Sequence, residues 1–251
     1  MANKCIAADR ILSKLDEYLN KNDYPSAERH LKFWLSEASQ ASDISTELLI
    51  QNELMGLYRK LGKKQEAFEA LDTAINKISS YGIGNQVGAA TTYLNAATVY
   101  KAFDLPNMSI PLFEKAKTIY ESELEASDSR LAGLYNNMAL ALVDLKRFSE
   151  ANKLYESAIS ILKSSDIDSL EIAITYLNMA SAAEAEFGLL DANETIDSYL
   201  KQAKELLEKC SKKNGYYAFV CEKCASVFGY YGYFLYENEL KKRARRIYEG
   251  A

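Results

Sequence analysis

Three short stretches of the chain place an asparagine in nearly the same apolar setting. They read YLNAA at 93–97, YNNMA at 135–139 and YLNMA at 176–180, so Asn95, Asn137 and Asn178 follow one another at steps of 42 and 41 residues. An amide offers N–H donors and a carbonyl acceptor, which are the groups that bind the backbone of an extended peptide. The pattern therefore favours a row of hydrogen-bonding side chains.

Residues suited to metal, redox or catalytic chemistry are few. Cys221 and Cys224 form a CxxC motif, but with Cys210, distant Cys5 and the single His30 they do not make a four-ligand zinc site. We expect these two cysteines to be small packing residues of a helix. The sequence has no GxSxG motif and no glycine-rich loop after a strand, so we expect no enzyme, no metal and no cofactor.

The composition indicates an all-helical protein. The 251 residues are 48% hydrophobic and 26% charged, with 3 Pro and 11 Gly, and runs of alternating β-branched residues are scarce. The net charge of -5 argues against nucleic acid or an anionic membrane as partner. The basic run KKRARR at 241–246 follows Glu237 and Glu239, and we interpret it as charges favoured near a helix C-terminus.

No apolar run is long enough to span a membrane, and the N-terminal stretch MANKCIAADR lacks the apolar core of a signal peptide. The four cysteines are unevenly spaced, which agrees with a reducing compartment. We therefore expect a cytoplasmic protein without a membrane segment.

One pattern of apolar and small residues recurs without a gap every 42 residues. Its first copy consists of Leu54, Tyr58, Gly62, Ala67, Leu71 and Ala74. The next two copies are Ala96, Tyr100, Asp104, Ser109, Phe113 and Ala116, then Met138, Leu142, Lys146, Ala151, Tyr155 and Ala158. Such periods are typical of repeat proteins. Small residues let helix axes approach, as at Ala97, Ala139 and Ala180.

The pattern resembles the tetratricopeptide repeat. Its 42-residue length and its Leu-Asn-x-Ala sequence are most similar to the kinesin light chain variety of this repeat. The resemblance implies an all-α fold, a right-handed α-solenoid of antiparallel helix pairs. We expect a single solenoid domain over residues 1–251, with about six pairs that start near 8, 48, 90, 132, 173 and 225. Asp23 and Asn107 are predicted as helix N-caps, and Asp168 with Glu171 as a capping box.

Each asparagine of the series lies about 200° around its helix from the tyrosine and the alanine two residues away. We therefore expect the amides on the inner, concave face, where asparagines of similar repeat proteins hold peptide backbone. The predicted groove is basic in its first half and acidic near Glu184 and Glu186, and its binding residues are Asn52, Arg59, Lys60, Asn95, Lys101, Asn136, Asn137 and Asn178. The alternative is that the amides bond to neighbouring helices and only space the repeats.

We interpret the chain as a non-enzymatic scaffold that binds a protein or peptide in this groove. A peptide-sensing regulatory repeat protein without its own DNA-binding domain is the alternative, since the first recognisable pair begins by about residue 6. The stretch from Tyr216 to Tyr236 is so rich in aromatic residues that it must be either deeply packed or in contact with another chain, and our hypothesis is a homodimer through the C-terminal helices.

Overall fold

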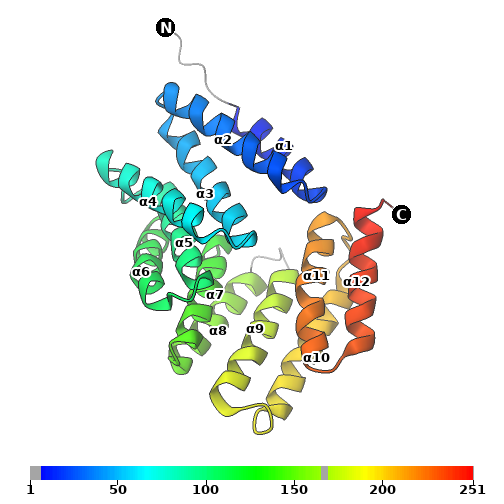
Figure 1. Cartoon of the computed structure of the whole chain (residues 1–251). Helices are drawn as coiled ribbons and strands as arrows, with labels where there is room; N and C mark the ends of the chain where they lie inside the picture. Colours follow the sequence, from blue (N-terminus) through cyan, green and yellow to red (C-terminus); the bar gives the residue numbers. More distant parts are fainter. Residues whose placement is uncertain (1–6, 165–168, 251) are drawn as a thin grey trace. The chain divides into compact units, whose positions relative to one another are not determined.

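The computed structural model describes residues 7–164 and 169–250. Over these residues it consists of twelve α-helices and contains no β-strand (Figure 1). The expected fold class, an α-solenoid of antiparallel helix pairs, is confirmed.

The chain divides into two compact units, which we call unit 1 (Met1–Glu123) and unit 2 (Leu124–Ala251). Unit 1 holds α1 (Ala8–Asn20), α2 (Tyr24–Gln40), α3 (Ile44–Lys60), α4 (Lys64–Ser80), α5 (Val87–Ala102) and α6 (Pro106–Glu123). Unit 2 holds α7 (Ser129–Asp144), α8 (Phe148–Ser164), α9 (Ser169–Phe187), α10 (Asn193–Lys209), α11 (Gly215–Tyr230) and α12 (Phe234–Tyr248).

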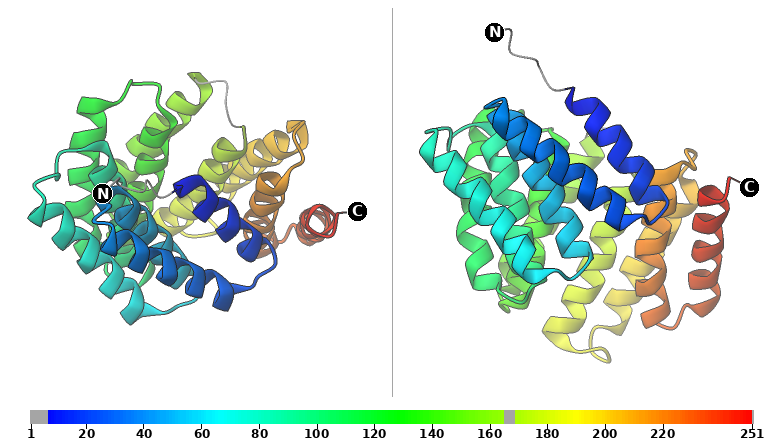
Figure 2. Two further views of the ribbon diagram at one scale, coloured as in Figure 1. Left: turned by 90° about the horizontal axis from the view of Figure 1, so that it is seen from above. Right: turned by 45° about the horizontal axis from the view of Figure 1, so that its top comes forward.

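The first helices of consecutive pairs lie side by side within each unit (Figures 1 and 2). In unit 1, α3 packs against α5, and in unit 2, α9 packs against both α7 and α11. We call α3 and α5 the first-helix layer of unit 1, and α7, α9 and α11 the first-helix layer of unit 2. The second helix of a pair contacts the first helix of the next pair, as α4 does with α5 and α8 with α9. This packing buries an apolar face that no single pair could bury alone.

The turn between the two helices of a pair repeats one backbone conformation. It has a residue of positive φ at 42-residue steps: Gly62 at 67°, Asp104 at 61°, Lys146 at 60° and Gly188 at 83°. In the first three turns the next N–H returns to the helix, with N–O distances of 2.9 Å from Lys63 to Tyr58, 3.0 Å from Leu105 to Tyr100 and 2.8 Å from Arg147 to Leu142. Such left-handed turns end helices by satisfying their last carbonyl groups.

Small residues bring the helices together as predicted. Ala97, Ala139 and Ala180 of the first helices are buried, as are Ala67 and Ala151 of the second helices. The larger residues of the repeat fill the remaining space, since Tyr58, Phe113 and Tyr155 are also buried. Burial of these side chains supplies the main favourable term in the stability of the fold.

The sixth pair begins earlier than its expected start near 225. Helix α11 starts at Gly215, where the side chain of Asn214 accepts a hydrogen bond from the Tyr217 N–H at 3.1 Å. Tyr217, Ala218 and Val220 are buried, so the apolar stretch that precedes 225 already forms the packed face of this helix.

Two of the helix-cap predictions can be compared with the structure. Asp23 caps α2 as predicted, and its Oδ1 accepts a hydrogen bond from the Ser26 N–H at 3.2 Å. The prediction for Asn107 is wrong, because α6 already begins at Pro106, a residue whose missing N–H suits a first helical position. Asp168 and residue 6 lie outside the described residues.

Candidate functional site

The predicted groove residues all lie on first helices. Unit 1 carries Asn52, Arg59 and Lys60 on α3 and Asn95 and Lys101 on α5, whereas unit 2 carries Asn136 and Asn137 on α7 and Asn178 on α9. All five asparagines are half-buried. An amide at this depth is shielded enough for a strong hydrogen bond and still reachable by a ligand.

In unit 1, Asn52 links two helices and keeps one unused acceptor. Its Nδ2 donates to the Oγ1 of Thr92 on α5 at 3.2 Å. The Thr92 hydroxyl is buried and in turn donates to the Gly88 carbonyl at 3.2 Å. The Oδ1 of Asn52 is buried and has no hydrogen-bond partner. Such an unsatisfied acceptor costs stability unless a bound group satisfies it.

Asn95 differs from the other amides. Its side chain makes no hydrogen bond to any residue that the structure describes, although it is half-buried on α5. All of its donors and its acceptor are therefore available to a ligand.

In unit 2 two amides of the series pair directly. The Nδ2 of Asn178 donates to the Oδ1 of Asn136 at 3.0 Å, and these residues are 42 positions apart. Asn137 instead donates to the carbonyl of Gly133 in its own helix at 2.8 Å. Asn136, and not Asn137, is therefore the structural equivalent of Asn178. The signal for this register was the 42-residue step itself, which also places Asn52 in the same slot two repeats earlier.

The charged residues of the predicted groove are distributed less simply than expected. Arg59 is exposed, while the Nζ of neighbouring Lys60 lies 5.1 Å from the ring centre of Tyr24 on α2. Glu184 accepts hydrogen bonds from the hydroxyl groups of Tyr230 at 2.7 Å and Tyr231 at 2.8 Å. Glu186 is half-buried. Lys60 and Glu184 therefore already interact with other side chains of the fold.

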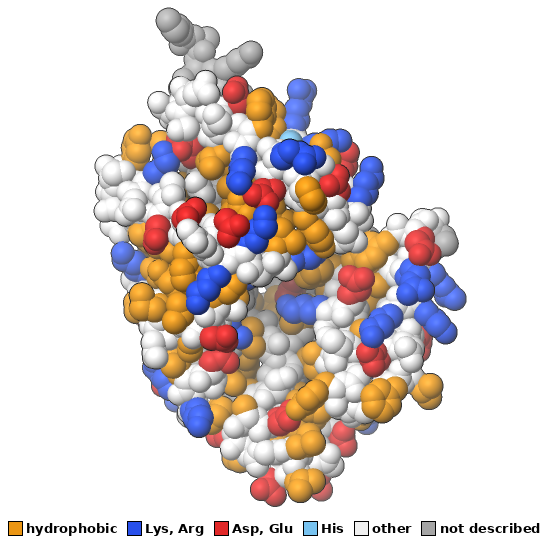
Figure 3. Space-filling view, in the orientation of Figure 1, with side chains coloured by type: hydrophobic (Ala, Val, Ile, Leu, Met, Phe, Trp, Pro, Cys, Tyr) orange, Lys and Arg blue, Asp and Glu red, His pale blue; other side chains and the backbone are white. Residues whose placement is uncertain are grey.

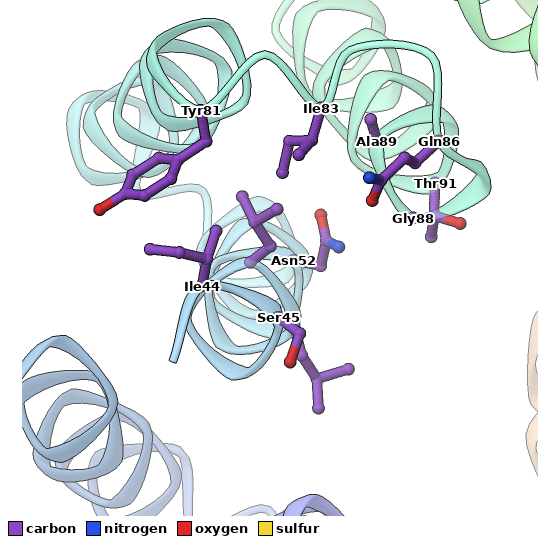
Figure 4. A pocket seen from close by; sticks show the side chains of 11 residues that line it. Ile44, Ser45, Asn52, Tyr81, Ile83, Gln86, Gly88, Ala89 and Thr91 are labelled. Atoms are coloured by element: carbon purple, nitrogen blue, oxygen red, sulfur yellow. The ribbon is translucent and has the colours of Figure 1, made fainter. Parts of the chain in front are cut away.

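Sequence reasoning missed a pocket of about 510 Å³ beside Asn52 (Figure 4). The link between α4 and α5 lies over the start of α3 and forms one wall. Leu48, Leu49, Asn52, Ile83 and Ala89 are among the lining residues, and the lining contains no charged side chain. The one sequence signal was the apolar Ile83 set between Gly82 and Gly84 in that link.

The comparison with protein families gives one match. The family model described as "Tetratricopeptide repeat" matches residues 131–164, which is the pair of α7 and α8. A curated relative, "Protein KINESIN LIGHT CHAIN-RELATED 3" of Arabidopsis thaliana, is 29% identical over 121 residues. That alignment covers 45% of this chain and only 17% of the length of the relative.

Solved structures share the fold over most of the chain. The crystal structure of BtubC (BKLC) from P. vanneervenii is similar with a TM-score of 0.68 and 19% identity, over 81% of this chain and 82% of that one. A putative kinesin light chain from Podosopora anserina with nearly identical TPR-like repeats gives a TM-score of 0.55 and 17% identity, over 81% of this chain and 95% of that one. The chain therefore contains a segment that matches the tetratricopeptide repeat, and it shares its fold with these solved structures. Tetratricopeptide repeats generally mediate protein–protein interactions, and scaffolds of this kind are typically non-enzymatic.

The thiols of α11 take part in packing. Cys221 and Cys224 are buried on α11 and are not joined in a disulfide. Burial raises the pKa of the Cys224 thiol to about 12, so it stays protonated at neutral pH. Within residues 7–164 and 169–250, no three His, Cys, Asp or Glu side chains are grouped so that they could hold a metal ion. In the same part of the chain, no helix combines the length and the apolar character needed to cross a bilayer.

Tyrosine hydroxyl groups bonded to carboxylates hold the last two helix pairs of the chain together. Besides the bonds to Glu184, Tyr233 donates to Asp197 at 3.1 Å and Tyr236 donates to Glu208 at 2.7 Å. Arg243 also donates to Glu208 at 3.0 Å, and this bond lowers the pKa of the Glu208 carboxyl. The aromatic C-terminal stretch is thus largely explained by packing between α9, α10, α11 and α12.

Proposed function

We propose that this chain is a non-enzymatic scaffold that binds an extended peptide segment of a partner protein along the first-helix layer of each unit. The observation that carries the proposal is the unused hydrogen-bonding capacity of the amides there. Asn95 makes no bond within the described residues, the Oδ1 of Asn52 has no partner, and Asn137 bonds only to its own helix. The N–H and carbonyl groups of a bound peptide would satisfy the unused hydrogen-bond donors and acceptors of these side chains.

The test is a peptide selected on the immobilised protein from a random display library. Its Kd is then measured by isothermal titration calorimetry with the wild type, Asn95→Ala and Asn137→Ala. Loss of one hydrogen bond of about 1 kcal/mol should weaken binding about 5-fold in each variant.

The matched control is Asn76→Ala, because Asn76 is an exposed asparagine on the second helix α4. Equal affinities of all four proteins, with unchanged thermal midpoints, would show that the amides do not bind the peptide.

We propose that the pocket beside Asn52 receives an uncharged, mainly apolar side chain of the same peptide, because its lining is mostly apolar and carries no charge. A substitution of Gly88 tests whether the pocket receives a peptide side chain. It lines the pocket within α5, and a Cβ at this position would meet no atom within 4 Å. Gly88→Leu should therefore fill the pocket and weaken peptide binding without unfolding the protein.

The control is Ser160→Leu, because Ser160 is exposed on the second helix α8 and makes none of the proposed peptide contacts. Peptide affinity should stay at the wild-type value in this control. Wild-type affinity in Gly88→Leu would place the peptide elsewhere.

A homodimer through the C-terminal helices stays a prediction, now with a narrower contact. Tyr217 and Phe228 are buried within the last pair, whereas Tyr216 and Phe219 are exposed and stacked with ring centres 6.3 Å apart. We propose this stacked pair at the start of α11 as the contact. Light scattering at high micromolar concentration should give the mass of a dimer, and a monomer mass for Phe219→Ser. A monomeric wild type would contradict the proposal.

A cytoplasmic location and the lack of a nucleic-acid partner are also part of the proposal. The free thiols Cys210, Cys221 and Cys224 are consistent with a reducing compartment. The net charge of -5 supports protein rather than nucleic acid as the partner class.

A further inference from the structure

Six large apolar side chains are exposed at two turns of unit 2. Phe187, Leu189 and Leu190 surround the turn between α9 and α10, and Tyr230, Phe234 and Leu235 surround the turn between α11 and α12. We call these six residues the hairpin corner. Leu190 and Leu235 are each 89% exposed, so neither gains stability from the fold. Exposed apolar patches of this kind mark interaction surfaces.

The two turns form one surface because hydrogen bonds join them. The hydroxyl groups of Tyr230 and Tyr231 both donate to Glu184 of α9, and the hydroxyl group of Tyr233 donates to Asp197 of α10. Both turns lie at the same end of their helices in Figures 1 and 2. Figure 3 shows orange side chains interspersed with red ones over these turns. The apolar residues are therefore held in place in the free protein.

The surroundings of the hairpin corner are acidic. Residues 183–200 and 224–240 together contain seven Asp or Glu and no Lys or Arg. Lys241 and Arg243 pair with Glu237 and Glu239. Glu186, Asp191 and Glu194 have no cationic partner among the described residues. Lys204 lies beside Phe234 and Leu235, with its Nζ 4.7 Å from the ring centre of Tyr236. The seven acidic residues outnumber this cation, so the net charge around the hairpin corner is negative.

This charge selects among the possible occupants. An anionic membrane surface would be repelled, and so would the hairpin corner of a second copy. A partner segment with apolar side chains on one face and Lys or Arg beside them would match both the patch and its rim. We propose that the hairpin corner docks such a basic amphipathic segment of a partner protein. The proposed groove plays no part in this contact, so the two proposals can fail separately.

The probe is a fluorescein-labelled Leu/Lys peptide of about 14 residues with Leu at helical i, i+3, i+4 spacing. Two matched peptides replace Lys by Glu or Leu by Ser. Fluorescence anisotropy should show that the Leu/Lys peptide binds the wild type and that both matched peptides bind more weakly by about tenfold or more. Raising the salt concentration should weaken binding of the Leu/Lys peptide.

Two variants locate the site. The Leu190→Ser/Leu235→Ser protein should bind the Leu/Lys peptide about tenfold or more weakly, because two anchoring side chains are removed. Its control is Phe33→Ser on α2, where the side chain is 57% exposed.

The Asp191→Lys/Glu194→Lys protein should lose affinity for the Leu/Lys peptide and gain affinity for the matched peptide in which Lys is replaced by Glu. Its control is Glu114→Lys on α6, an exposed acidic residue of unit 1.

The outcomes that overturn the proposal are distinct. Absence of wild-type binding, or equal binding by wild type and Leu190→Ser/Leu235→Ser, removes the hairpin corner as the site. Self-association in sedimentation velocity that the same double variant abolishes would assign the corner to a second copy. Binding of the wild type to phosphatidylserine vesicles, lost in the double variant, would assign it to a membrane.

Discussion

The same slot of the repeat is used differently in the two units. In unit 2 it holds Asn136 and Asn178, which bond to each other across α7 and α9. In unit 1 it holds Asn52 and then Leu94, so Asn52 bonds to Thr92 and its Oδ1 has no partner beside an apolar pocket. A complete amide pair spaces the repeats, whereas an interrupted one leaves an acceptor beside a cavity. The comparison suggests a structural role for the Asn136–Asn178 pair in unit 2 and a binding role for Asn52 in unit 1.

The largest expected effect comes from breaking the complete pair. Asn178→Leu leaves the Asn136 carbonyl oxygen without its donor and should lower the free energy of unfolding by about 1 to 2 kcal/mol. Asn52→Leu removes a side chain whose acceptor is already unpaired and should change the stability by less than about 0.5 kcal/mol. Urea unfolding followed by circular dichroism measures both. Equal losses would mean that the two units use their amides in the same way.

An acidic residue in each unit allows a comparison of their response to pH. In unit 1, hydrogen bonds from Lys32 and Lys63 lower the pKa of Glu28 from 4.5 to about 2, and both Nζ–O distances are 2.7 Å. A carboxyl whose pKa is lower in the folded state stabilises the fold above its unfolded pKa. That contribution, of the order of 1 kcal/mol after screening by solvent, should disappear as the pH falls from about 4.5 to 2.

The matched residue of unit 2 is Asp128, whose pKa is also lowered to about 2, by hydrogen bonds from Arg130 two residues away. Glu28 joins α2 to the turn after α3, whereas the Asp128 bonds are local. Urea midpoints between about pH 5 and 2 should therefore become less pH-dependent in Glu28→Gln than in Asp128→Asn. A larger change in Asp128→Asn would contradict this ranking.

The smallest expected effect comes from restoring the interrupted slot. Leu94→Asn places an amide opposite Asn52 at the 42-residue step and gives its Oδ1 a donor. The loss of apolar burial at Leu94 obscures the gain in the single variant, so a double-mutant cycle with Asn52→Leu is needed. We expect a favourable coupling of about 0.5 to 1 kcal/mol. A coupling near zero would mean that the backbones of α3 and α5 hold the two side chains apart.

Much of the fold could be predicted because each repeat contains the residues that determine its own helix pair. Buried alanines such as Ala97 and Ala139, and the positive-φ turn at Gly62, recur at a constant step, and helix pairing follows from them. The start of the sixth pair was predicted too late because its packed face mixes aromatic Tyr217 and Phe228 with small residues such as Ala218 and Cys221, and this mixture does not follow the residue pattern of the three clear copies. At Asp104 and Lys146 the turn keeps its conformation without glycine, so the spacing carried more information than the residue type.

The candidate site was less predictable than the fold. The amides were correctly assigned to first helices, but neighbouring Asn136 and Asn137 could not be distinguished without knowing which one faces α9. The pocket beside Asn52 depends on how the link from Tyr81 to Gln86 folds back over α3. The hairpin corner depends on the meeting of two turns far apart in the sequence.

The buried thiols of α11 can report how often this helix transiently separates from the helices packed against it. With Cys5 and Cys210 changed to serine, a thiol-specific reagent can reach Cys221 and Cys224 only when α11 separates from its neighbours. The labelling rate under native conditions therefore measures how often the last hairpin detaches, without any denaturant. A partner that binds this hairpin and keeps it attached to the fold would slow the labelling of both thiols, whatever its effect on the remaining repeats.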